Sequence, residues 1–344
     1  MSRNKPQAEG ITRVSAQALI RLRLQAGAFL LDSQKIRARQ GGAYLSTFKG
    51  RGMEFDESRI YQPGDDIRNM DWRVTARTGN AHTKVFREER ERPVLLWLDL
   101  SRSMMFATRN KFKAVIAAEL ASLLAWSANQ NGDRVGGLIF SENEHIELKP
   151  RRGKAAVLDF IGRCARHGAW NSLFPEQDGP VKSGDSDATT EARRNSAEAA
   201  ARLRKVAHTG GLIFMLSDFR YMSKKAYSHI ANISRHNSIV FIQITDPLEK
   251  QLPARGFYKL TDGQKEITLN AGNSKLRNDY RQRYQQRQHK LDRFCRQNGI
   301  HRIEISTADN AQEKLKAGLL SRQPDHDRPP SAGAPAAKKP GEQA

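Results

Sequence analysis

The sequence has few cysteines and no long hydrophobic run, and both absences narrow the class of protein. Only two of its 344 residues are cysteines, Cys164 and Cys295, so a disulfide framework is excluded and a reducing compartment is expected. The longest apolar stretch, 114–128, includes Glu119 and falls short of the ~20 residues that cross a bilayer. The polar opening shows no signal-peptide pattern. We therefore expect a cytoplasmic protein with no transmembrane segment.

The motifs of several enzyme classes are also missing. No Gly-x-x-x-x-Gly-Lys-Ser/Thr sequence occurs, which argues against ATP binding by a P-loop. No Gly-x-Ser-x-Gly or His-Glu-x-x-His sequence occurs either, and the nine histidines are scattered. A phosphatase that forms an aspartyl phosphate normally carries a second aspartate two residues after the first, where this chain has Ser101 after Asp99. We therefore expect a protein that is not an enzyme.

Acidic residues are scarce relative to basic ones. The chain has 37 Asp and Glu against 58 Lys and Arg, which gives a formal net charge of +21. Such an excess favours association with polyanions, but it says nothing about the fold. The hydrophobic fraction of 38% is sufficient for a folded core. Nucleic acid and anionic lipid thus stay open as partners.

From residue 94 onward, short apolar runs alternate with longer amphipathic segments, which is typical of an α/β domain with a mostly parallel sheet. The run 94–98 is too short for a typical helix and ends at Asp99, as a strand buried on both faces would. We predict further strands over 134–140, 145–148, 212–216, 239–245 and 300–305, and a hairpin over 257–269. Helices that cover both faces of the sheet are predicted over 111–129, 154–166, 191–207, 224–236, 276–294 and 310–320.

The remaining parts of the chain are distinguished by composition. Residues 1–40 are assigned to a basic helical segment, in which Asp32 is the only acid between residues 11 and 39. Residues 41–92 mix glycines, aromatic residues and charges without a helical period, which predicts a small β-rich unit. The α/β domain then occupies 93–320. Residues 321–344 are dominated by Pro, Ala, Lys and Gly and are predicted to be disordered.

The strongest chemical signal is the sequence Asp99-Leu100-Ser101-Arg102-Ser103, at the end of the first strand of the α/β domain. In open α/β sheets, ligands bind at the carboxyl ends of the strands. Alternate oxygen-bearing side chains suit a water-rich Mg²⁺ site, and Asp218, at the end of a later apolar strand, supplies a second carboxylate. In the alternative interpretation, Asp99 caps the following turn and the serines satisfy backbone amides.

This arrangement resembles the metal-ion-dependent adhesion site of von Willebrand factor A-type domains, which have a Rossmann-like fold. The resemblance implies that Ser101 and Ser103 bind the metal directly, while Asp99 and Asp218 act in supporting positions. It also implies a threonine ligand, for which Thr189 and Thr190 are both candidates. The implied metal is Mg²⁺, with Mn²⁺ as an alternative.

Residues 50–136 resemble a bacterial family called domain of unknown function 58. The segments that carry the resemblance are Gly52-Met53-Glu54-Phe55, Arg59-Ile60-Tyr61, Pro63-Gly64-Asp65-Asp66-Ile67-Arg68, Asp71-Trp72-Arg73, Ala76-Arg77, Lys84, Phe86 and Glu88-Glu89-Arg90. The resemblance implies a non-enzymatic adaptor that works with a MoxR-type AAA+ ATPase in protein maturation, complex assembly or stress response. Membrane-anchored proteins with von Willebrand A domains are implied as further partners, which would place the chain at the periphery of the inner membrane.

The turn around Asp65 and Asp66 concentrates carboxylates beside several arginines, and two interpretations stay open. In the first, an ion-pair network with Arg68, Arg73 and Arg77 fixes the small unit against the α/β domain. In the second, the segment is a docking surface for a partner protein with Trp72 as an anchor, because Trp and Arg are enriched at interface hot spots. The candidate docking residues are Asp65, Asp66, Arg68, Asp71, Trp72 and Arg73.

A competing hypothesis is that the protein binds nucleic acid through the polar side of its long C-terminal helix. That side carries Lys275, Arg277, Arg281, Arg283, Arg287, Lys290, Arg293 and Arg296. Phosphate contacts would make such binding steeply dependent on salt concentration. In the alternative interpretation, these residues are only the solvated side of the helix, and no known nucleic-acid-binding sequence pattern accompanies them.

Overall fold

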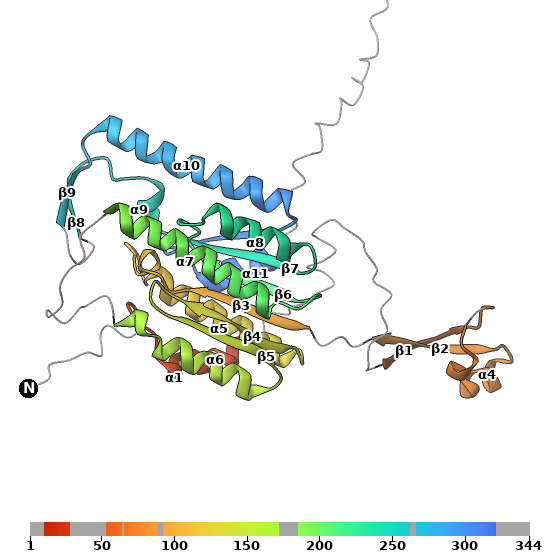
Figure 1. Ribbon diagram of the computed structural model, residues 1–344. Coiled ribbons are helices and arrows are strands. Elements are labelled where there is room, and N and C mark those ends of the chain that lie inside the picture. Colours follow the sequence, from red (N-terminus) through yellow and green to blue (C-terminus); the bar gives the residue numbers. More distant parts are fainter. Residues whose placement is uncertain are drawn as a thin grey trace, which may run out of the picture.

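The computed structural model describes residues 10–27, 53–63, 65–88, 92–171, 185–261 and 266–320 (Figure 1). Several predictions lie outside these residues. They are the disordered tail predicted over 321–344, residues 172–184 between the helices predicted over 154–166 and 191–207, and the turn of the hairpin at 262–265. Residues 1–9 and 28–40 of the basic segment assigned to 1–40 also lie outside them.

A six-stranded sheet forms the centre of the α/β domain, in the order β10-β7-β6-β3-β4-β5. The strands are β3 (Pro93–Asp99), β4 (Arg134–Phe140), β5 (His145–Arg151), β6 (Leu212–Ser217), β7 (Ser238–Thr245) and β10 (His301–Ser306). All neighbours are parallel except β5, which is antiparallel to β4 at one edge. The predicted mixed α/β architecture with a mostly parallel sheet is therefore confirmed.

The central strands are apolar because helices cover both faces of the sheet. Every residue of β3, β6 and β7 is buried. Side chains alternate along β3, so Leu96 and Leu98 enter one core while Leu95 and Trp97 enter the other. The first core includes α5 (Lys113–Gln130), α6 (Lys154–Arg166) and α11 (Ala311–Leu320) (Figure 1). The second includes α7 (Asp185–Val206), α8 (Lys224–Ser234) and α10 (Ser274–Gln297).

The described part of the N-terminal segment packs into the first core, although we predicted from the sequence that residues 1–40 are separate from the α/β domain. Its helices are α1 (Ala16–Arg21) and α2 (Arg23–Ala26), which pack against α6 and α5. Leu19 and Ala26 are fully buried, and the Trp126 indole Nε1 donates a hydrogen bond to the Leu19 carbonyl oxygen at 3.4 Å. Residues 10–27 are therefore an integral part of the α/β domain.

The small unit contains more helix than expected. Strands β1 (Met53–Ile60) and β2 (His82–Glu88) form an antiparallel pair, and the short 3-10 helix η1 (Ile67–Asn69) and α4 (Trp72–Thr78) lie between them in the chain. Helix α4 was missed because its seven residues are too few to show a 3.6-residue period. Its ends are fixed locally, since the Asp71 side chain accepts from the Val74 backbone N–H and Gly79 adopts the left-handed conformation.

The other elements agree with the sequence pattern, with one exception. Helix α7 begins at Asp185, six residues before the predicted start at Glu191. The predicted hairpin is present as the antiparallel strands β8 (Phe257–Thr261) and β9 (Glu266–Asn270). Short helical turns complete the domain: η2 (Arg102–Met104), η3 (Gly168–Trp170) and α9 (Pro247–Lys250). Within the described ranges, no helix is both long and apolar enough to span a membrane.

Candidate functional site

The two strand ends that carry the predicted site are neighbours in the sheet. Strands β3 and β6 are parallel and adjacent, so Asp99 and Asp218 emerge at the same edge. A pocket lies there, with a free volume of about 20 Å³, enough for one water-sized group. Its polar lining consists of Asp99, Ser101, Ser103, Ser141, Glu142, Asn195, Ser196, Ser217, Asp218 and Tyr221. The structure therefore brings together the four residues that the sequence singled out, Asp99, Ser101, Ser103 and Asp218.

Asp99 is buried and held by two hydrogen bonds. The Ser217 hydroxyl donates to its Oδ2 at 2.6 Å, and the Ser101 backbone N–H donates to its Oδ1 at 2.9 Å. The second bond is the one predicted by the alternative interpretation, in which Asp99 caps the following turn and binds no metal. The hydroxyls of Ser101 and Ser103 lie at the pocket, where their oxygens are 3.3 Å apart. Asp99 forms no ion pair with any side chain in the described ranges.

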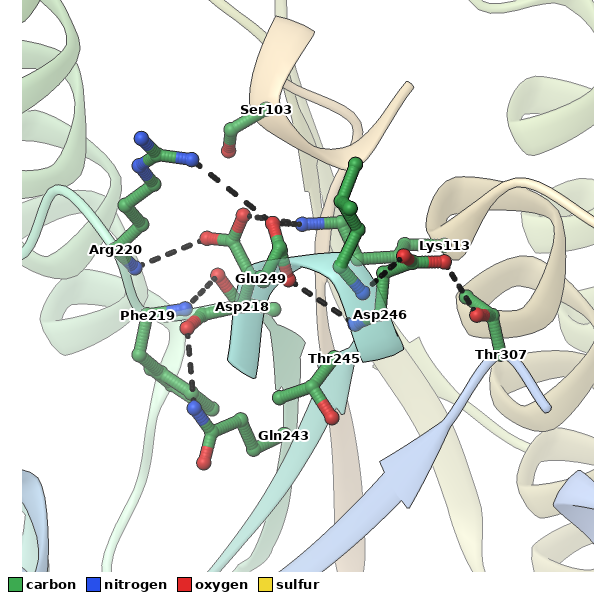
Figure 2. Close-up of polar contacts among 12 residues, drawn as sticks. Ser103, Lys113, Asp218, Phe219, Arg220, Gln243, Thr245, Asp246, Glu249 and Thr307 are labelled. Carbon is green, nitrogen blue, oxygen red and sulfur yellow. Dashed lines mark hydrogen bonds and ion pairs between the residues drawn. The ribbon is translucent and has the colours of Figure 1, made fainter. Parts of the chain in front are cut away.

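Asp218 differs from Asp99 because a cation is already beside it. The Lys113 Nζ atom donates to Asp218 Oδ2 at 2.9 Å, while the Arg220 backbone N–H donates to Oδ1 at 2.9 Å (Figure 2). The intervening Phe219 has a φ of 54°, a left-handed conformation that is uncommon for a bulky residue. This turn directs the Asp218 carboxylate toward Lys113.

Lys113 is a charged residue beside the pocket that the sequence motifs did not indicate. It is the first residue of α5, is fully buried, and also donates to Glu249 Oε1 at 2.6 Å. Glu249 is fixed in turn, because its Oε2 accepts from the Asp246 backbone N–H at 3.1 Å in the capping box of α9. The available signal was a lysine immediately before the apolar run 114–118, a place where a charged side chain needs a buried partner.

The electrostatics of the two aspartates therefore diverge. Burial and the nearby charge of Asp218 raise the pKa of Asp99 to about 7, although hydrogen bonds from Ser217 and Ser101 oppose this. Burial is the largest single effect on Asp218 and acts to raise its pKa, but the charge and hydrogen bond of Lys113, together with hydrogen bonds from the Arg220 backbone N–H and Ser103, hold that pKa below its ordinary value. For Lys113, burial acts to lower the pKa, and the carboxylates of Asp218 and Glu249 reverse the effect and raise it.

Helix α7 reaches the pocket with different residues from those expected. Asn195 and Ser196 line it, whereas Thr189 and Thr190, more than one helical turn earlier, do not. Asn195 Nδ2 donates to the Glu142 carbonyl oxygen at 3.0 Å, which ties α7 to the loop after β4. Thr189 is half-buried and Thr190 is exposed. A threonine ligand for the metal stays a prediction.

The donor set fits a hard divalent cation. Two hydroxyls and two carboxylates offer only oxygen atoms, which Mg²⁺ and Mn²⁺ accept and which suit Zn²⁺ less well. In the part of the chain that the structure describes, no three His, Cys, Asp or Glu side chains gather as a metal site. The observation that favours a cation here is Asp99 itself, a buried carboxylate whose ionised form lacks a cationic partner in the described ranges.

The carboxylates of the small unit stabilise its own turns rather than pairing with the expected arginines. Asp65 pairs with Arg59 at 2.6 Å, and Asp66 accepts from the Arg68 backbone N–H at 3.0 Å. Asp71 caps α4 and also accepts from the Ser58 hydroxyl at 2.6 Å. The ion-pair network predicted for Arg68, Arg73 and Arg77 is therefore not found among the described residues.

Trp72 is unusually exposed for its size. Its exposed fraction is 67%, and that of Ile67 in the adjacent η1 is 65%. Arg68 and Arg73 are exposed too. Isolated exposed apolar residues are common, but a tryptophan, an isoleucine and two arginines within seven residues of the sequence have the composition of an interface hot spot.

Helix α10 has the predicted division into an apolar and a basic side. Leu291 and Cys295 are buried in the second core, with Phe294 packed against it. The exposed basic residues are Lys275, Arg281, Arg283, Arg287, Lys290, Arg293 and Arg296. Arg277 instead donates to the backbone carbonyl oxygens of Ala254 and Ala271, so it has a structural role.

The fold and the site define a mixed α/β protein with a six-stranded, mostly parallel sheet and a cluster of polar side chains at the carboxyl ends of its central strands. The chain belongs to the family described as Protein of unknown function DUF58, whose model matches residues 57–290. The family expected from the sequence is thereby confirmed.

Relatives extend the similarity over most of the chain. Uncharacterized protein Mb1516 of Mycobacterium bovis is 27% identical over 299 residues, which cover 87% of this chain and 83% of the relative. Uncharacterized protein Rv1480 of Mycobacterium tuberculosis matches with the same identity and coverage.

Two crystal structures align with part of the chain. One is the conserved hypothetical protein BatB from Bacteroides thetaiotaomicron, at 14% identity and a TM-score of 0.35, covering 66% of this chain and 97% of that one. The other is an aerotolerance-related membrane protein from Bacteroides fragilis, at 17% identity and a TM-score of 0.35, covering 66% and 96%. TM-scores this low do not establish a shared fold.

Proposed function

We propose that this protein is a non-enzymatic adaptor that binds a partner protein through a divalent metal at the β3–β6 edge, in a domain of von Willebrand A type. The observation that carries the proposal is the convergence of Asp99, Ser101, Ser103 and Asp218 on one small pocket at adjacent strand ends. Those residues would hold Mg²⁺, or Mn²⁺ in its place. When bound, the metal would supply a Lewis-acidic position for an oxygen ligand from the partner.

The charge balance of the cluster favours recognition of an acidic group. Asp99, Asp218 and Glu249 contribute three negative charges when ionised, and Lys113 and Arg220 contribute two positive charges. With all three carboxylates ionised, the cluster carries one net negative charge, and a divalent cation would leave it with one net positive charge. A carboxylate of a partner protein would neutralise this remainder. The basic surface of the chain would further steer an acidic partner toward the site.

Binding is favoured over catalysis because no histidine lines the pocket, and the Ser217 hydroxyl, which donates to Asp99, is buried and also accepts from a backbone N–H. The Ser101 and Ser103 hydroxyls contact each other, and the Ser217 hydroxyl donates to Asp99 while accepting from the Phe219 backbone N–H. The two histidines whose buried Nε2 atoms form no hydrogen bond, His145 and His167, are absent from the pocket lining.

The partner we propose is a MoxR-type AAA+ ATPase, which the family resemblance implies, in protein maturation, complex assembly or stress response. Membrane-anchored proteins with von Willebrand A domains are proposed as further partners of a cytoplasmic chain. The exposed Trp72 and Ile67, with Arg68 and Arg73, support a second contact surface on the small unit. Asp65, Asp66 and Asp71 would hold that surface in shape through the turns they stabilise.

A second candidate function, nucleic-acid binding, is favoured by the exposed basic side of α10. Seven lysines and arginines of this side are exposed, where phosphates could reach them, and two of them, Arg287 and Lys290, also lie over the rings of Tyr284 and Tyr227. The two functions differ in their response to solution conditions. Nucleic-acid binding would weaken steeply with salt, whereas adaptor binding would require magnesium.

The first test measures the metal directly. Full-length wild type and the double variant Ser101→Ala/Ser103→Ala are titrated with Mn²⁺ by calorimetry after treatment with EDTA, with Ser122→Ala, a buried serine of α5, as the matched control. We expect binding by wild type and by the control, and a loss of at least tenfold in affinity for the double variant.

The second test identifies the partner. Immobilised wild type and Asp99→Ala are exposed to lysate of the source organism with Mg²⁺ or EDTA, with and without ATP, and retained proteins are identified by mass spectrometry. An AAA+ ATPase retained only by wild type in Mg²⁺ would support the adaptor. Equal retention by both proteins in EDTA would refute the metal mechanism. Recovery chiefly of nucleic acid, lost at moderate salt, would favour α10 as the functional surface.

A further inference from the structure

We propose that Lys113 is a built-in counterion that competes with the divalent cation for Asp218 and keeps the site stable when no metal is bound. The inference rests on the metal site proposed above and assigns a regulatory role to a residue outside the metal-binding motif. It concerns the buried cluster of Lys113, Asp218 and Glu249 shown in Figure 2.

The first observation is that Lys113 is completely removed from solvent. A buried ammonium is strongly disfavoured unless opposite charges and hydrogen bonds compensate for its lost hydration. Here the Nζ atom lies 2.9 Å from Asp218 Oδ2 and 2.6 Å from Glu249 Oε1. These two carboxylates give Lys113 charged partners on both the β6 end and the β7 end of the sheet.

The second observation is that Lys113 occupies one oxygen of a proposed metal-site carboxylate. Asp218 Oδ1 accepts from the Arg220 backbone N–H, and Oδ2 accepts from Lys113. The charge of Asp218 is thus already matched by an ammonium, whereas Asp99 has no such partner in the described ranges. A divalent cation must therefore share Asp218 with Lys113, and this sharing weakens its attraction to the site.

The third observation is that Glu249 is anchored independently of Asp218. Its Oε2 accepts from the Asp246 backbone N–H at 3.1 Å. Asp246 is itself held by the hydroxyls of Thr108 and Thr307, each at 2.6 Å. Glu249 can therefore retain the Lys113 ammonium when the charge of Asp218 is shared with a second cation. The lysine does not become an unpaired buried charge in either state.

Because of this arrangement, the protein does not need a bound metal in order to fold. Without Lys113, the metal-free site would contain three carboxylates against Arg220 alone, and their repulsion would favour permanent occupancy by a cation. With Lys113, the metal-free protein is stable and the metal affinity is lower. We infer that occupancy of the site follows the free Mg²⁺ concentration, so that partner binding can be switched.

The test varies the charge of the cluster without touching the proposed metal ligands. Full-length wild type, Lys113→Met and the double variant Lys113→Met/Glu249→Gln are titrated with Mn²⁺ by calorimetry at the same pH. We expect Lys113→Met to bind Mn²⁺ at least tenfold more tightly than wild type. The double variant restores the net charge of the wild-type cluster, and its affinity should return to within about threefold of wild type.

A second variant keeps the inference testable if Lys113→Met does not fold. Glu249→Gln leaves the ammonium with Asp218 as its only carboxylate partner, so competition increases, and we expect Mn²⁺ affinity at least tenfold below wild type. Thermal melts in EDTA provide a readout that needs no metal. Lys113→Met should melt well below wild type, and excess Mn²⁺ should raise its melting temperature more than that of wild type.

The outcomes separate this inference from the proposed function. If wild type binds Mn²⁺ and Ser101→Ala/Ser103→Ala does not, while Glu249→Gln and Lys113→Met bind as wild type does, the metal site stands and the role of Lys113 is refuted. Weaker binding by Lys113→Met would also refute it. If neither wild type nor Lys113→Met binds Mn²⁺, both proposals are overturned.

Discussion

Replacing Asp99 by asparagine tests the electrostatics of the site with a single atom change. The Asp99 carboxylate is buried beside Asp218, so its ionised form is disfavoured when no metal is present. Asparagine keeps the size of the side chain and retains an oxygen that can accept the Ser101 backbone N–H. Ser217 can turn its hydroxyl to accept from the new amide. The variant therefore removes the charge while leaving the packing in place.

The expected effect depends on pH in a defined direction. The pKa of Asp99 is raised from its ordinary value of 3.8 to about 7 in the folded protein. Between these values the folded state keeps a proton that the unfolded chain has lost, so the stability of wild type falls as the pH rises through this window. A difference of about three pH units corresponds to about 4 kcal/mol, at about 1.4 kcal/mol per unit. This contribution is fully present below about pH 4 and is lost above about pH 7.

The assay is urea unfolding of metal-free protein in EDTA between pH 4 and pH 8.5, for wild type and Asp99→Asn. Titrating groups distant from the site contribute equally to both proteins, so the difference between their free energies of unfolding reports Asp99 and its interaction with Asp218. As the pH rises, we expect the free energy of unfolding of the variant to increase relative to that of wild type by up to about 4 kcal/mol. Asp279→Asn, which replaces an exposed carboxylate on α10, is measured in the same way as the control.

A pH-independent difference between wild type and Asp99→Asn would refute the reasoning, because it would mean that Asp99 titrates alike in the folded and unfolded states. A difference that falls with pH would also refute it, since it would show that the ionised carboxylate is stabilised in the folded protein. Excess Mg²⁺ should reduce the pH dependence of wild type, because a bound cation stabilises the ionised form.

Three further substitutions test the fold around the site. In Gly137→Ala, the new Cβ atom would lie 2.1 Å from the Leu96 carbonyl oxygen, so we expect a loss of at least about 3 kcal/mol or no folded protein, measured by thermal melts followed by circular dichroism. Phe160→Ala removes a fully buried ring, and urea unfolding should show a loss of about 3–5 kcal/mol. Thr307→Val removes the hydroxyl that donates to buried Asp246 at 2.6 Å, and the same measurement should show a loss of about 1–3 kcal/mol.

Most secondary structure followed from local sequence patterns. Buried strands such as 212–216 read as short apolar runs between turn residues, and α6 showed a clear amphipathic period. The two wrong predictions of secondary structure also came from local sequence. Helix α4 has only seven residues, and α7 begins inside a polar, acidic stretch whose composition resembles a loop.

The proposed metal motif could be read from the sequence because its residues are tied to strand ends. Parallel strands present their carboxyl ends at one edge, so Asp99 and Asp218 could be placed together without coordinates. The expected threonine could not be placed, because the polar residues before the helix predicted over 191–207 show no periodicity that fixes its position. The pocket receives Asn195 and Ser196 from that helix.

Sequence alone determined the alternation of strands and helices, the basic excess and the residues at the two strand ends, because these depend on side-chain periodicity and on neighbours along the chain. Tertiary structure decided the charges around those residues. Lys113 lies 105 positions from Asp218 and 136 from Glu249, and only the stacking of α5 against the β6 and β7 ends brings the three together. Electrostatic interactions act through space, so the state of a buried carboxylate depends on which distant side chains the fold places beside it.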